Sequence, residues 1–347
     1  MDRNLHRQHN PQITVKECWH RRNCFLVDVR SPQEFLDGCL PDAVNLPLLD
    51  DTERKTVGIL YKRYGQRRAV ERGYRILEPK LDALRKRFQR FPKSKTAVVY
   101  CSRGGMRSQV ITALMRSFGY RARQLAGGYK GFRTWNIKQL EQFEYGEIIV
   151  LHGQTGVGKT AILNRLQNAV DLEGIAGHRG SMFGGIGKIP ATQKRFDANL
   201  LRALEAIDTA MPLFVEGESR KIGAVTIPRN LYDRMQRARN LLLKAPLHIR
   251  VERTVEEYIT RQPDAIPEIR STIGYLKRDL GKAEVTRLRR LLDEKEYREC
   301  FRGILESYYD KKYSHGINRL SYEREIDTEI ISAAVSRIMQ TARSLRS

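Results

Sequence analysis

The fold of the first part of the chain is decided by the segment VVYCSRGGMRS (98–108), in which an apolar run ends on a cysteine. The run TAVVYC (96–101) predicts a buried strand, and the residues from Met106 onward predict an amphipathic helix. Glycines in the connecting turn allow backbone N–H groups to point toward the sulfur of Cys101, and the helix dipole and two arginines add positive charge. These features favour a nucleophilic thiolate and the binding of an oxyanion. The predicted anion-binding loop consists of Cys101, Arg103, Gly104, Gly105 and Arg107.

Short strands and helices alternate around this segment. CFLVDVR (24–30) and AVNLPL (43–48) predict strands, and SPQEFLDG (31–38) predicts a short helix between them, with Ser31 as its cap. Residues 50–92 are polar, basic and helical in pattern. This alternation predicts an α/β domain.

In chain order, DVRSPQEF (28–35), GCLPDAVNLP (38–47), CSRGGMRS (101–108) and LAGGYKGF (125–132) resemble the motifs of rhodanese-like sulfurtransferase domains. The resemblance implies that Cys101 carries a persulfide or its selenium analogue. It also implies that Asp28 and Arg30 support the loop without reacting. Tyrosine phosphatases share the Cys-x5-Arg spacing, but they usually have His where this chain has Tyr100, and no general-acid loop is evident. Phosphatase chemistry is therefore disfavoured.

A second deciding segment is EIIVLHGQTGVGKT (147–160), which predicts a strand, a glycine-rich turn and the start of a helix. The turn matches G-x-x-x-x-G-K-[ST], whose backbone N–H groups wrap phosphate oxygens. Lys159 adds a mobile positive charge, and the hydroxyl of Thr160 is placed to ligate Mg²⁺. A nucleotide base pocket is not evident, so the loop suits a diphosphate leaving group equally well. The predicted diphosphate-binding residues are Gly153, Gly156, Val157, Gly158, Lys159 and Thr160.

Two polar segments follow the P-loop. DLEGIAGHRGSMFGGIG (171–187) is glycine-rich and is interpreted either as a ligand-binding loop or as a mobile surface connection. PLFVEGES (212–219) predicts a second parallel strand with a polar loop at its end, where α/β sheets place ligand groups. Either glutamate of that segment would serve a Mg²⁺ site through water. The predicted substrate or supporting residues are Asp171, Glu173, His178, Arg179, Ser181, Glu216, Glu218 and Arg220.

The ordered motifs GQTGVGKT, DLEGIAGHRGSMFG, VEGESRKIG (215–223) and YYDKKY (308–313), after a rhodanese-like domain, resemble the tRNA 2-selenouridine synthase family. The resemblance runs over nearly the whole chain. It implies a rhodanese-like α/β domain at 1–138 and a P-loop α/β domain at 139–347 with a basic helical C-terminal part. It further implies that wobble 2-thiouridine in the anticodon loop of tRNA is S-geranylated with geranyl diphosphate and then selenated from selenophosphate through Cys101. Mg²⁺ is an expected co-factor of the first step, and no tightly bound cofactor is expected.

The composition agrees with a polyanionic partner. The 347 residues include 63 Lys and Arg against 40 Asp and Glu, a formal net charge of +23. Clustered cations of this kind favour nucleic acid, and we expect contacts from the Arg/Tyr-rich stretch 61–75 and from the helical C-terminal third. The C-terminal candidates are Arg234, Arg237, Arg239, Lys277, Arg278, Arg287, Arg289 and Arg290.

The cysteines and the lengths of the apolar runs indicate in which cellular compartment the chain is expected. No apolar run reaches the length of a membrane span, and the N-terminal residues lack the apolar core of a signal peptide. Five cysteines without a CxxC pair favour a reducing, cytoplasmic location, with no membrane partner. The cysteines other than Cys101 are interpreted as packing residues: Cys18, Cys24, Cys39 and Cys300.

Two alternatives stay open. In the first, the chain is an ATP-dependent tRNA sulfurtransferase whose P-loop activates a base while Cys101 delivers sulfur. In the second, it is a non-catalytic, P-loop-regulated RNA-binding protein. Hydrolysis of ATP in the presence of tRNA would favour the first. A Cys101 thiol with the acidity of a free thiol would favour the second.

Overall fold

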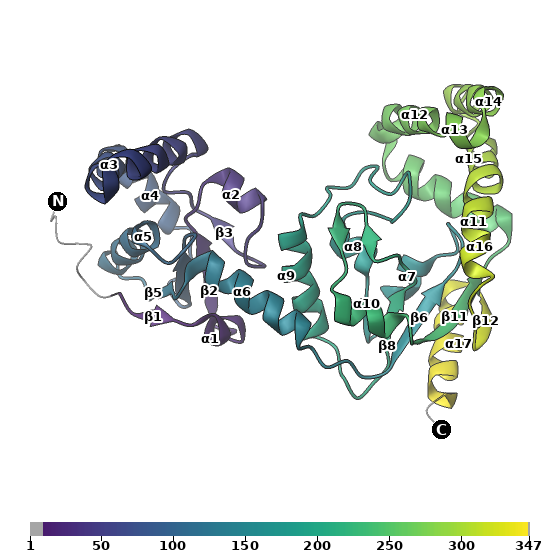
Figure 1. Ribbon diagram of the computed structural model, residues 1–347, viewed down its shortest axis with the longest axis horizontal. Helices are drawn as coiled ribbons and strands as arrows, with labels where there is room; N and C mark the ends of the chain where they lie inside the picture. Colours follow the sequence, from purple (N-terminus) through teal and green to yellow (C-terminus); the bar gives the residue numbers. More distant parts are fainter. Residues whose placement is uncertain (1–9, 346–347) are drawn as a thin grey trace. The chain divides into compact units, whose positions relative to one another are not determined.

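The structure, a computed structural model, describes residues 10–345, apart from the side chains of 314 and 315. The chain divides into two compact units, unit 1 up to Gln139 and unit 2 from Leu140 (Figure 1). Parallel sheets flanked by helices in both units confirm the predicted α/β fold class. None of the helices within the described residues is both long enough and apolar enough to cross a membrane.

Unit 1 is built on a five-stranded parallel sheet with strand order β1-β5-β4-β2-β3. The strands are β1 (Gln12–Ile13), β2 (Cys24–Asp28), β3 (Val44–Asn45), β4 (Thr96–Tyr100) and β5 (Ala122–Leu125). The central strand β4 pairs with β2 on one side and with β5 on the other. Cys101 therefore follows the carboxyl end of the central strand, which is where parallel sheets place functional groups.

Helices cover this sheet and supply the rest of the unit 1 core. They are α1 (Val15–Trp19), α2 (Pro32–Leu36), α3 (Asp51–Leu77), η1 (Glu78–Lys80), α4 (Leu81–Phe88), α5 (Met106–Ser117) and α6 (Gly128–Glu141). Strand residues such as Val27 and Val99 pack against Phe88 of α4 and Ile111 of α5. The long helix α3 differs, because only its last third contributes buried side chains and because it bends at Gly65, whose φ is +79°.

The segment between the units departs from the sequence-based expectation. The polar stretch 136–147 has the composition of an interdomain linker, yet α6 continues through Glu141. Beyond it, Asn230 donates to the carbonyl of Leu140 (2.6 Å), and Arg234 donates to the carbonyls of Tyr145 and Gly146. The polar composition of this stretch therefore reflects an exposed helix and a hydrogen-bonded connection.

Unit 2 contains a second five-stranded parallel sheet, with strand order β7-β8-β6-β11-β12. Its strands are β6 (Ile148–His152), β7 (Ala169–Val170), β8 (Leu213–Glu216), β11 (Arg239–Lys244) and β12 (Arg324–Asp327), and a hairpin of β9 (Lys221–Ile222) and β10 (Val225–Thr226) lies outside it. The region beyond residue 230 was expected to be largely helical, and β11 and β12 were missed there. A short apolar run such as Leu241–Leu243 inside a basic stretch does not distinguish strand from helix by periodicity.

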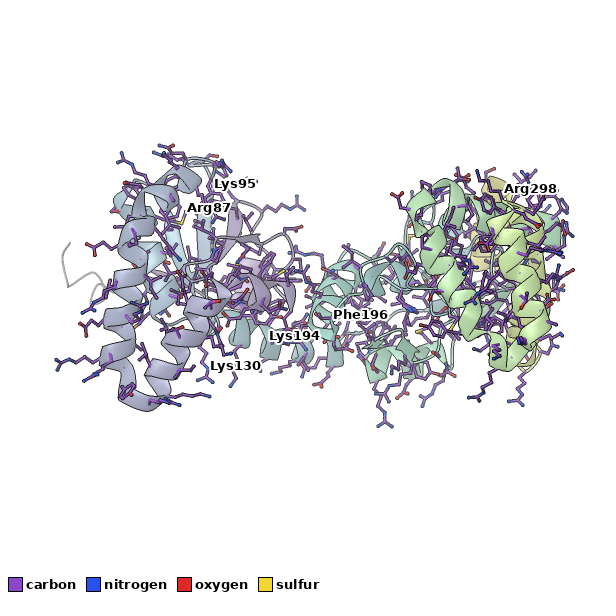
Figure 2. The ribbon with its side chains drawn as sticks, turned by 90° about the horizontal axis from the view of Figure 1, so that it is seen from above. Arg87, Lys95, Lys130, Lys194, Phe196 and Arg298 are labelled. Carbon is purple, nitrogen blue, oxygen red and sulfur yellow. The ribbon has the colours of Figure 1, made fainter. Side chains whose placement is uncertain are left out.

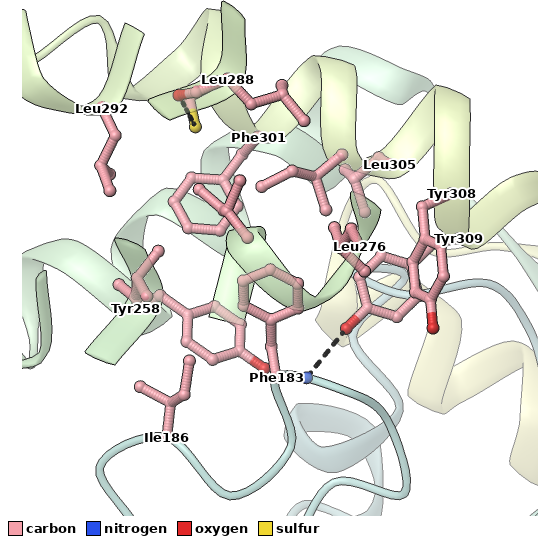
Figure 3. Close-up of a cluster of buried hydrophobic side chains, with 14 of the residues drawn as sticks. Phe183, Ile186, Tyr258, Leu276, Leu288, Leu292, Phe301, Leu305, Tyr308 and Tyr309 are labelled. Atoms are coloured by element: carbon pink, nitrogen blue, oxygen red, sulfur yellow. Dashed lines mark hydrogen bonds between the residues drawn. The ribbon is translucent and has the colours of Figure 1, made fainter. Parts of the chain in front are cut away.

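The helices of unit 2 form two groups. One group flanks the sheet: α7 (Lys159–Leu163), α8 (Leu172–Ala176), α9 (Gln193–Leu204), α10 (Arg229–Met235) and α17 (Ile331–Ser344). The other group forms a helical layer: α11 (Leu247–Val255), η2 (Glu256–Thr260), η3 (Pro263–Ala265), α12 (Ile266–Tyr275), α13 (Lys277–Leu280), α14 (Lys282–Asp293), α15 (Tyr297–Ile304), η4 (Leu305–Tyr309) and α16 (Asp310–Ile317). The core of this layer includes Phe183, Tyr258 and Phe301, and the rings of Tyr258 and Phe301 stack with centroids 5.8 Å apart (Figure 3).

Two candidate active-site loops

The Cys101 loop surrounds its sulfur with donors. Cys101 is 4% exposed, and its Sγ accepts a hydrogen bond from the N–H of Gly105 (3.3 Å). The hydroxyl of Ser108, at the first turn of α5, lies 3.2 Å from the same sulfur. Ser108 was not among the predicted site residues. The sequence signal was available, because Ser108 lies one helical turn beyond the loop glycines and faces the same side.

The segment LAGGYKGF (125–132) supports the Cys101 loop through backbone hydrogen bonds. The N–H groups of Tyr129 and Lys130, at the start of α6, donate to the carbonyls of Cys101 (2.8 Å) and Ser102 (2.9 Å). Gly128 has a φ of +56°, and a Cβ there would overlap the carbonyl oxygen of Cys101 and the nitrogen of Gly104. The two backbones approach this closely only because residue 128 is glycine.

The two arginines of the loop have different environments. Arg107 forms an ion pair with Glu34 (2.6 Å) and donates to the hydroxyl of Ser102 (2.9 Å). Burial by itself raises the pKa of Glu34, but the hydrogen bond and charge of Arg107 outweigh it and lower that pKa to about 2. Arg103 is exposed and lines a shallow hollow together with Lys130. Arg107 is thus neutralised within the chain, whereas Arg103 faces outward.

Asp28 and Arg30 form a buried pair near the loop. Their side chains are paired at 2.6 Å, and Arg30 also donates to the carbonyl of Gly38. The guanidinium lies 3.8 Å from the ring centroid of Tyr129, the residue whose N–H holds Cys101. A buried ion pair in this position supports the loop through packing against Tyr129.

The P-loop forms between β6 and α7, as expected. Gly153, Gly156 and Gly158 all have positive φ, and Lys159 donates from Nζ to the carbonyl of Gly153 (2.9 Å). The loop opens onto a cleft of about 1210 Å³. Val157 differs from its neighbours, because its side chain is 1% exposed and belongs to the hydrophobic core under the sheet. Its N–H donates to the carbonyl of Gln154 (3.3 Å), so Val157 shapes the loop from within.

Side chains from later parts of the chain support the P-loop by donating hydrogen bonds to its backbone carbonyls. Arg250 of α11 is 3% exposed, pairs with Asp310 and donates to the carbonyl of Thr155 (2.8 Å). Arg253, also in α11, and the hydroxyl of Thr328 both donate to the carbonyl of Val157. The sequence carries no local signal for these contacts, which depend on how α11 and the end of β12 reach the loop.

Three glutamates gather beside Lys159. Glu216, at the end of β8, is 1% exposed and accepts from the N–H of Glu173 (2.6 Å) through one oxygen, while its other oxygen has no partner among the described residues. Burial, helped by Asp171 and Glu173, raises the pKa of Glu216 well above its usual value. Burial and the neighbouring charge of Glu173 raise the pKa of Glu218 to about 8, although Lys159 opposes this shift. Glu218 lines the same cleft as Lys159, and its raised pKa favours the protonated carboxyl near neutral pH.

The glycine-rich loop 177–187 is anchored at both of its sides. Arg179 pairs with Glu257 (2.6 Å), and Ser181 accepts from the hydroxyl of Tyr309 (2.9 Å). Phe183 is buried in the helical core, where its N–H lies 3.5 Å from the hydroxyl of Tyr309 (Figure 3). The alternative of a mobile surface connection is therefore wrong, since the loop is packed into unit 2.

The predicted residues of unit 2 fall into two groups. Those that line the cleft are Gly153, Gly156, Gly158, Lys159, Thr160, Glu173, Arg179, Ser181 and Glu218. Those that do not line it are Val157, Asp171, His178, Glu216 and Arg220. His178 accepts from the N–H of Gly180, and burial lowers its pKa. Asp171 caps α8 by accepting from the N–H of Gly174, and Arg220 is exposed.

The lining residues that sequence reasoning did not predict include His152 and Arg253. His152, directly before the P-loop, lies with Nε2 3.0 Å from the Oδ1 of Asn240, and burial lowers its pKa. Arg253 lines the cleft as well as bracing the loop. The position of His152 next to Gly153 was a usable signal, whereas nothing near Arg253 in the sequence pointed to the P-loop.

The cleft beside the P-loop offers some of the oxygen ligands that Mg²⁺ needs, but not a complete set. Within the described residues, no group of three His, Cys, Asp or Glu side chains is arranged to hold a metal ion alone. The cleft presents oxygens from Thr160, Glu173 and Glu218, however. Mg²⁺ commonly binds through a few protein oxygens together with substrate phosphates, and these residues suit that arrangement.

Comparison with known proteins places the two units in their families. A rhodanese-like domain model matches residues 14–134, and the model of the AAA domain of tRNA 2-selenouridine synthase matches residues 146–344. A rhodanese-like domain protein from Staphylococcus aureus with a solved structure is 19% identical, covers 35% of this chain and 90% of its own, and has a TM-score of 0.24. The chain is thus a rhodanese-like domain joined to a P-loop domain of the AAA class.

Relatives of full length define the family further. The tRNA 2-selenouridine synthase of Hydrogenovibrio crunogenus is 35% identical over 329 residues, which are 86% of this chain and 90% of the relative. The tRNA 2-selenouridine synthase of Sulfurovum sp. is 34% identical over 328 residues, with the same coverage of both chains. The chain belongs to the tRNA 2-selenouridine synthase family.

Proposed function

We propose that this chain is a cytoplasmic tRNA-modifying enzyme that converts wobble 2-thiouridine to 2-selenouridine. The observation that carries the proposal is the presence of two anion-binding loops in one chain that synthases of this name match over 86% of its length. Each loop suits a different anion, and the reaction needs two. The net charge of +23 suits an RNA substrate.

The first step is assigned to unit 2. The sulfur of 2-thiouridine attacks C1 of geranyl diphosphate, the C1–O bond breaks, diphosphate leaves and the base loses its N3 proton. The P-loop N–H groups and Lys159 stabilise the leaving diphosphate, and Mg²⁺ shared with Thr160 would supply further positive charge. Lys159 is held at the loop by its hydrogen bond to Gly153, so it is ready to turn toward an incoming phosphate.

The second step is assigned to unit 1. The selenium of selenophosphate attacks C2 of the base, the C2–S bond breaks and geranyl thiol leaves, and water then cleaves the Se–P bond to release phosphate. Cys101 is assigned the role of delivering the selenium donor to C2. The N–H of Gly105 and the hydroxyl of Ser108 are within hydrogen-bonding distance of Sγ and stabilise negative charge there. Arg107 cannot supply a free charge to this anion while it is paired with Glu34, which leaves Arg103 as the outward cation of the loop.

A pair of variants tests this division of labour. Cys101→Ser should abolish selenation of tRNA while leaving S-geranylation intact, and Lys159→Ala should depress S-geranylation first. Both products are measured by mass spectrometry of the wobble nucleoside after incubation with geranyl diphosphate and then selenophosphate. Selenation by the Cys101→Ser variant would exclude Cys101 as the carrier, and undiminished geranyl transfer by Lys159→Ala would remove the P-loop from the first step.

The same assay separates the ATP-dependent alternative. If unit 2 uses diphosphate as a leaving group, modification proceeds without ATP, and ATP hydrolysis is not stimulated by tRNA. ATP hydrolysis that depends on tRNA and is lost in Lys159→Ala would instead support the sulfurtransferase alternative.

A further inference from the structure

The middle of α3 carries a basic and aromatic surface. The segment Tyr61–Arg68, YKRYGQRR, has eight residues that are all exposed, and it contains four cations, two tyrosines and no carboxylate. Tyr61 and Tyr64 are 58% and 57% exposed. Exposed aromatic rings beside cations provide the stacking surfaces and positive charge that unpaired nucleotides bind.

The cations of this segment are not used by the rest of the chain. Across the described residues, Lys62, Arg63, Arg67 and Arg68 form no ion pair. The guanidinium of Arg68 lies over the ring of Tyr64 (5.5 Å to the centroid). Their charge is therefore available to an outside anion.

The basic residues of the C-terminal third present a contrast. Most of the arginines expected to contact nucleic acid there are engaged within unit 2. Arg239 donates to the carbonyl of Leu345, Arg287 pairs with Glu284, and Arg290 pairs with Glu294. Arg234 and Arg289 likewise donate to backbone carbonyls. The cations of the Tyr61–Arg68 segment are therefore less engaged within the chain than the arginines of the C-terminal third.

The segment lies beside the Cys101 loop. Gln66 donates from Nε2 to the Sδ of Met106 (3.7 Å), the residue that begins α5 directly after the loop. At the other end of the same helix, Arg54 lies 3.7 Å from Glu34, the carboxylate that holds Ser102 and Arg107. Figure 2 shows the side chains of this long helix pointing outward from the ribbon. A ligand on α3 would therefore border the reactive cysteine.

The backbone of α3 is also open to close approach. Gly58, Gly65 and Gly73 each have nothing within 4 Å of the position where a Cβ would lie. Gly65 allows the bend through its positive φ, but no contact within the chain explains the other two, which weaken a helix. Glycines facing solvent on a binding helix leave room for a partner at the backbone.

From these observations we infer that the Tyr61–Arg68 segment binds unpaired nucleotides of the RNA substrate next to Cys101. Tyr61 and Tyr64 stack on bases, and the four cations contact the adjoining phosphates, a combination typical of single-stranded RNA recognition. The inference rests on the proposed function, because tRNA is the substrate there. A membrane surface fits less well, because a membrane-bound helix needs a continuous apolar face and four of the eight consecutive exposed residues here are cations.

The stacking part is tested by removing the rings. In the full-length protein, Tyr61→Ala/Tyr64→Ala should weaken binding of an unmodified tRNA transcript by about five-fold or more, since each stacked base contributes at least that much. Affinity is measured by fluorescence anisotropy, and a blunt RNA duplex without unpaired bases should bind this variant as it binds the wild type. Tyr275→Ala, at a 70% exposed tyrosine of α12, is the matched control and should leave tRNA affinity unchanged.

The charge part is tested by the dependence on salt. Arg67→Ala/Arg68→Ala should lower the slope of log K against log salt concentration by about 1.4, the value for two phosphates of a single strand. Equal thermal midpoints for all variants would show that the fold is intact.

Two outcomes are distinguishable. If the wild type binds tRNA and both double variants bind with the same affinity and slope, or if the tyrosine variant loses as much affinity for the duplex, this inference is overturned alone. If the wild type itself fails to bind tRNA, the proposed function is overturned and the inference falls with it.

Discussion

At the scale of single residues, the Cys101 loop depends on the absence of a Cβ at Gly128 and on the ion pair between Arg107 and Glu34. Gly128 lies against the carbonyl of Cys101 and the nitrogen of Gly104, and this contact allows α6 to donate two hydrogen bonds to the loop. The positive charge of Arg107 is balanced by the carboxylate of its partner Glu34. The first feature determines the shape of the loop and the second its charge, and both contribute to the free energy of unfolding.

Gly128→Ala should destabilise unit 1. A Cβ at this position overlaps two backbone atoms and has to adopt a φ of +56°, so we expect a loss of about 2–4 kcal/mol in the free energy of unfolding, measured with urea. Gly58→Ala is the matched control, because it places the same methyl group in open space on a helix and should stabilise by about 0.5–1 kcal/mol. Equal effects of the two substitutions would contradict the close approach at Gly128.

Glu34 should make stability depend on pH in a defined window. Its pKa in the folded chain is about 2, below the ordinary value of 4.5, so the folded state favours the ionised form. The stabilisation is complete above about pH 4.5 and is lost as the pH falls toward 2. Glu34→Gln should therefore cost about 1–3 kcal/mol at pH 7 and progressively less below pH 4.5, as measured by urea unfolding between pH 3 and 7. A difference independent of pH would show that the charge of Glu34 is not what stabilises the loop.

At the scale of elements, the sequence predicted the strands and turns that carry each loop but not the elements that brace them. β4, β6 and β8 are apolar runs followed by glycines, so local pattern was sufficient for them. Gln124, which donates to the carbonyl of Gly104, and Arg250, which donates to the carbonyl of Thr155, come from other elements. Their partners depend on how strands and helices pack, and no periodicity in a short window encodes that choice.

Arg250 of α11 provides a test of this bracing. Arg250→Lys keeps the positive charge but loses the two-pronged pairing with Asp310 and the bond to Thr155, so we expect a loss of about 2–4 kcal/mol in stability and weaker binding of inorganic pyrophosphate. Calorimetry of unfolding and of pyrophosphate binding measures both. Arg270→Lys is the control, because Arg270 pairs with Asp293 in the same two-pronged way on an exposed surface outside the cleft, where such pairs contribute little. Equal losses in the two variants would argue against the bracing role.

At the scale of the whole molecule, the chain contains separate hydrophobic cores. One core belongs to unit 1 and includes Leu84, whereas the helical core of unit 2 includes Leu288, and the two share no residue. A protein with separate cores of this kind is expected to unfold in more than one cooperative step.

Differential scanning calorimetry tests that expectation. Leu84→Ala and Leu288→Ala each remove a buried side chain, at 4% and 0% exposure, and each should cost about 2–5 kcal/mol. Each variant should lower the midpoint of one transition and leave the other in place. A single transition that both substitutions lower would show that the units unfold together.

The burial of Cys101 also bears on how the enzyme avoids damage between turnovers. At 4% exposure, the bare thiol is poorly accessible to bulky oxidants and disulfides. A chalcogen atom attached to Sγ would extend the side chain by about 2 Å and bring its terminal atom closer to the opening. In such a loaded form the terminal atom would be more accessible than the bare thiol, whose burial shields it from oxidation.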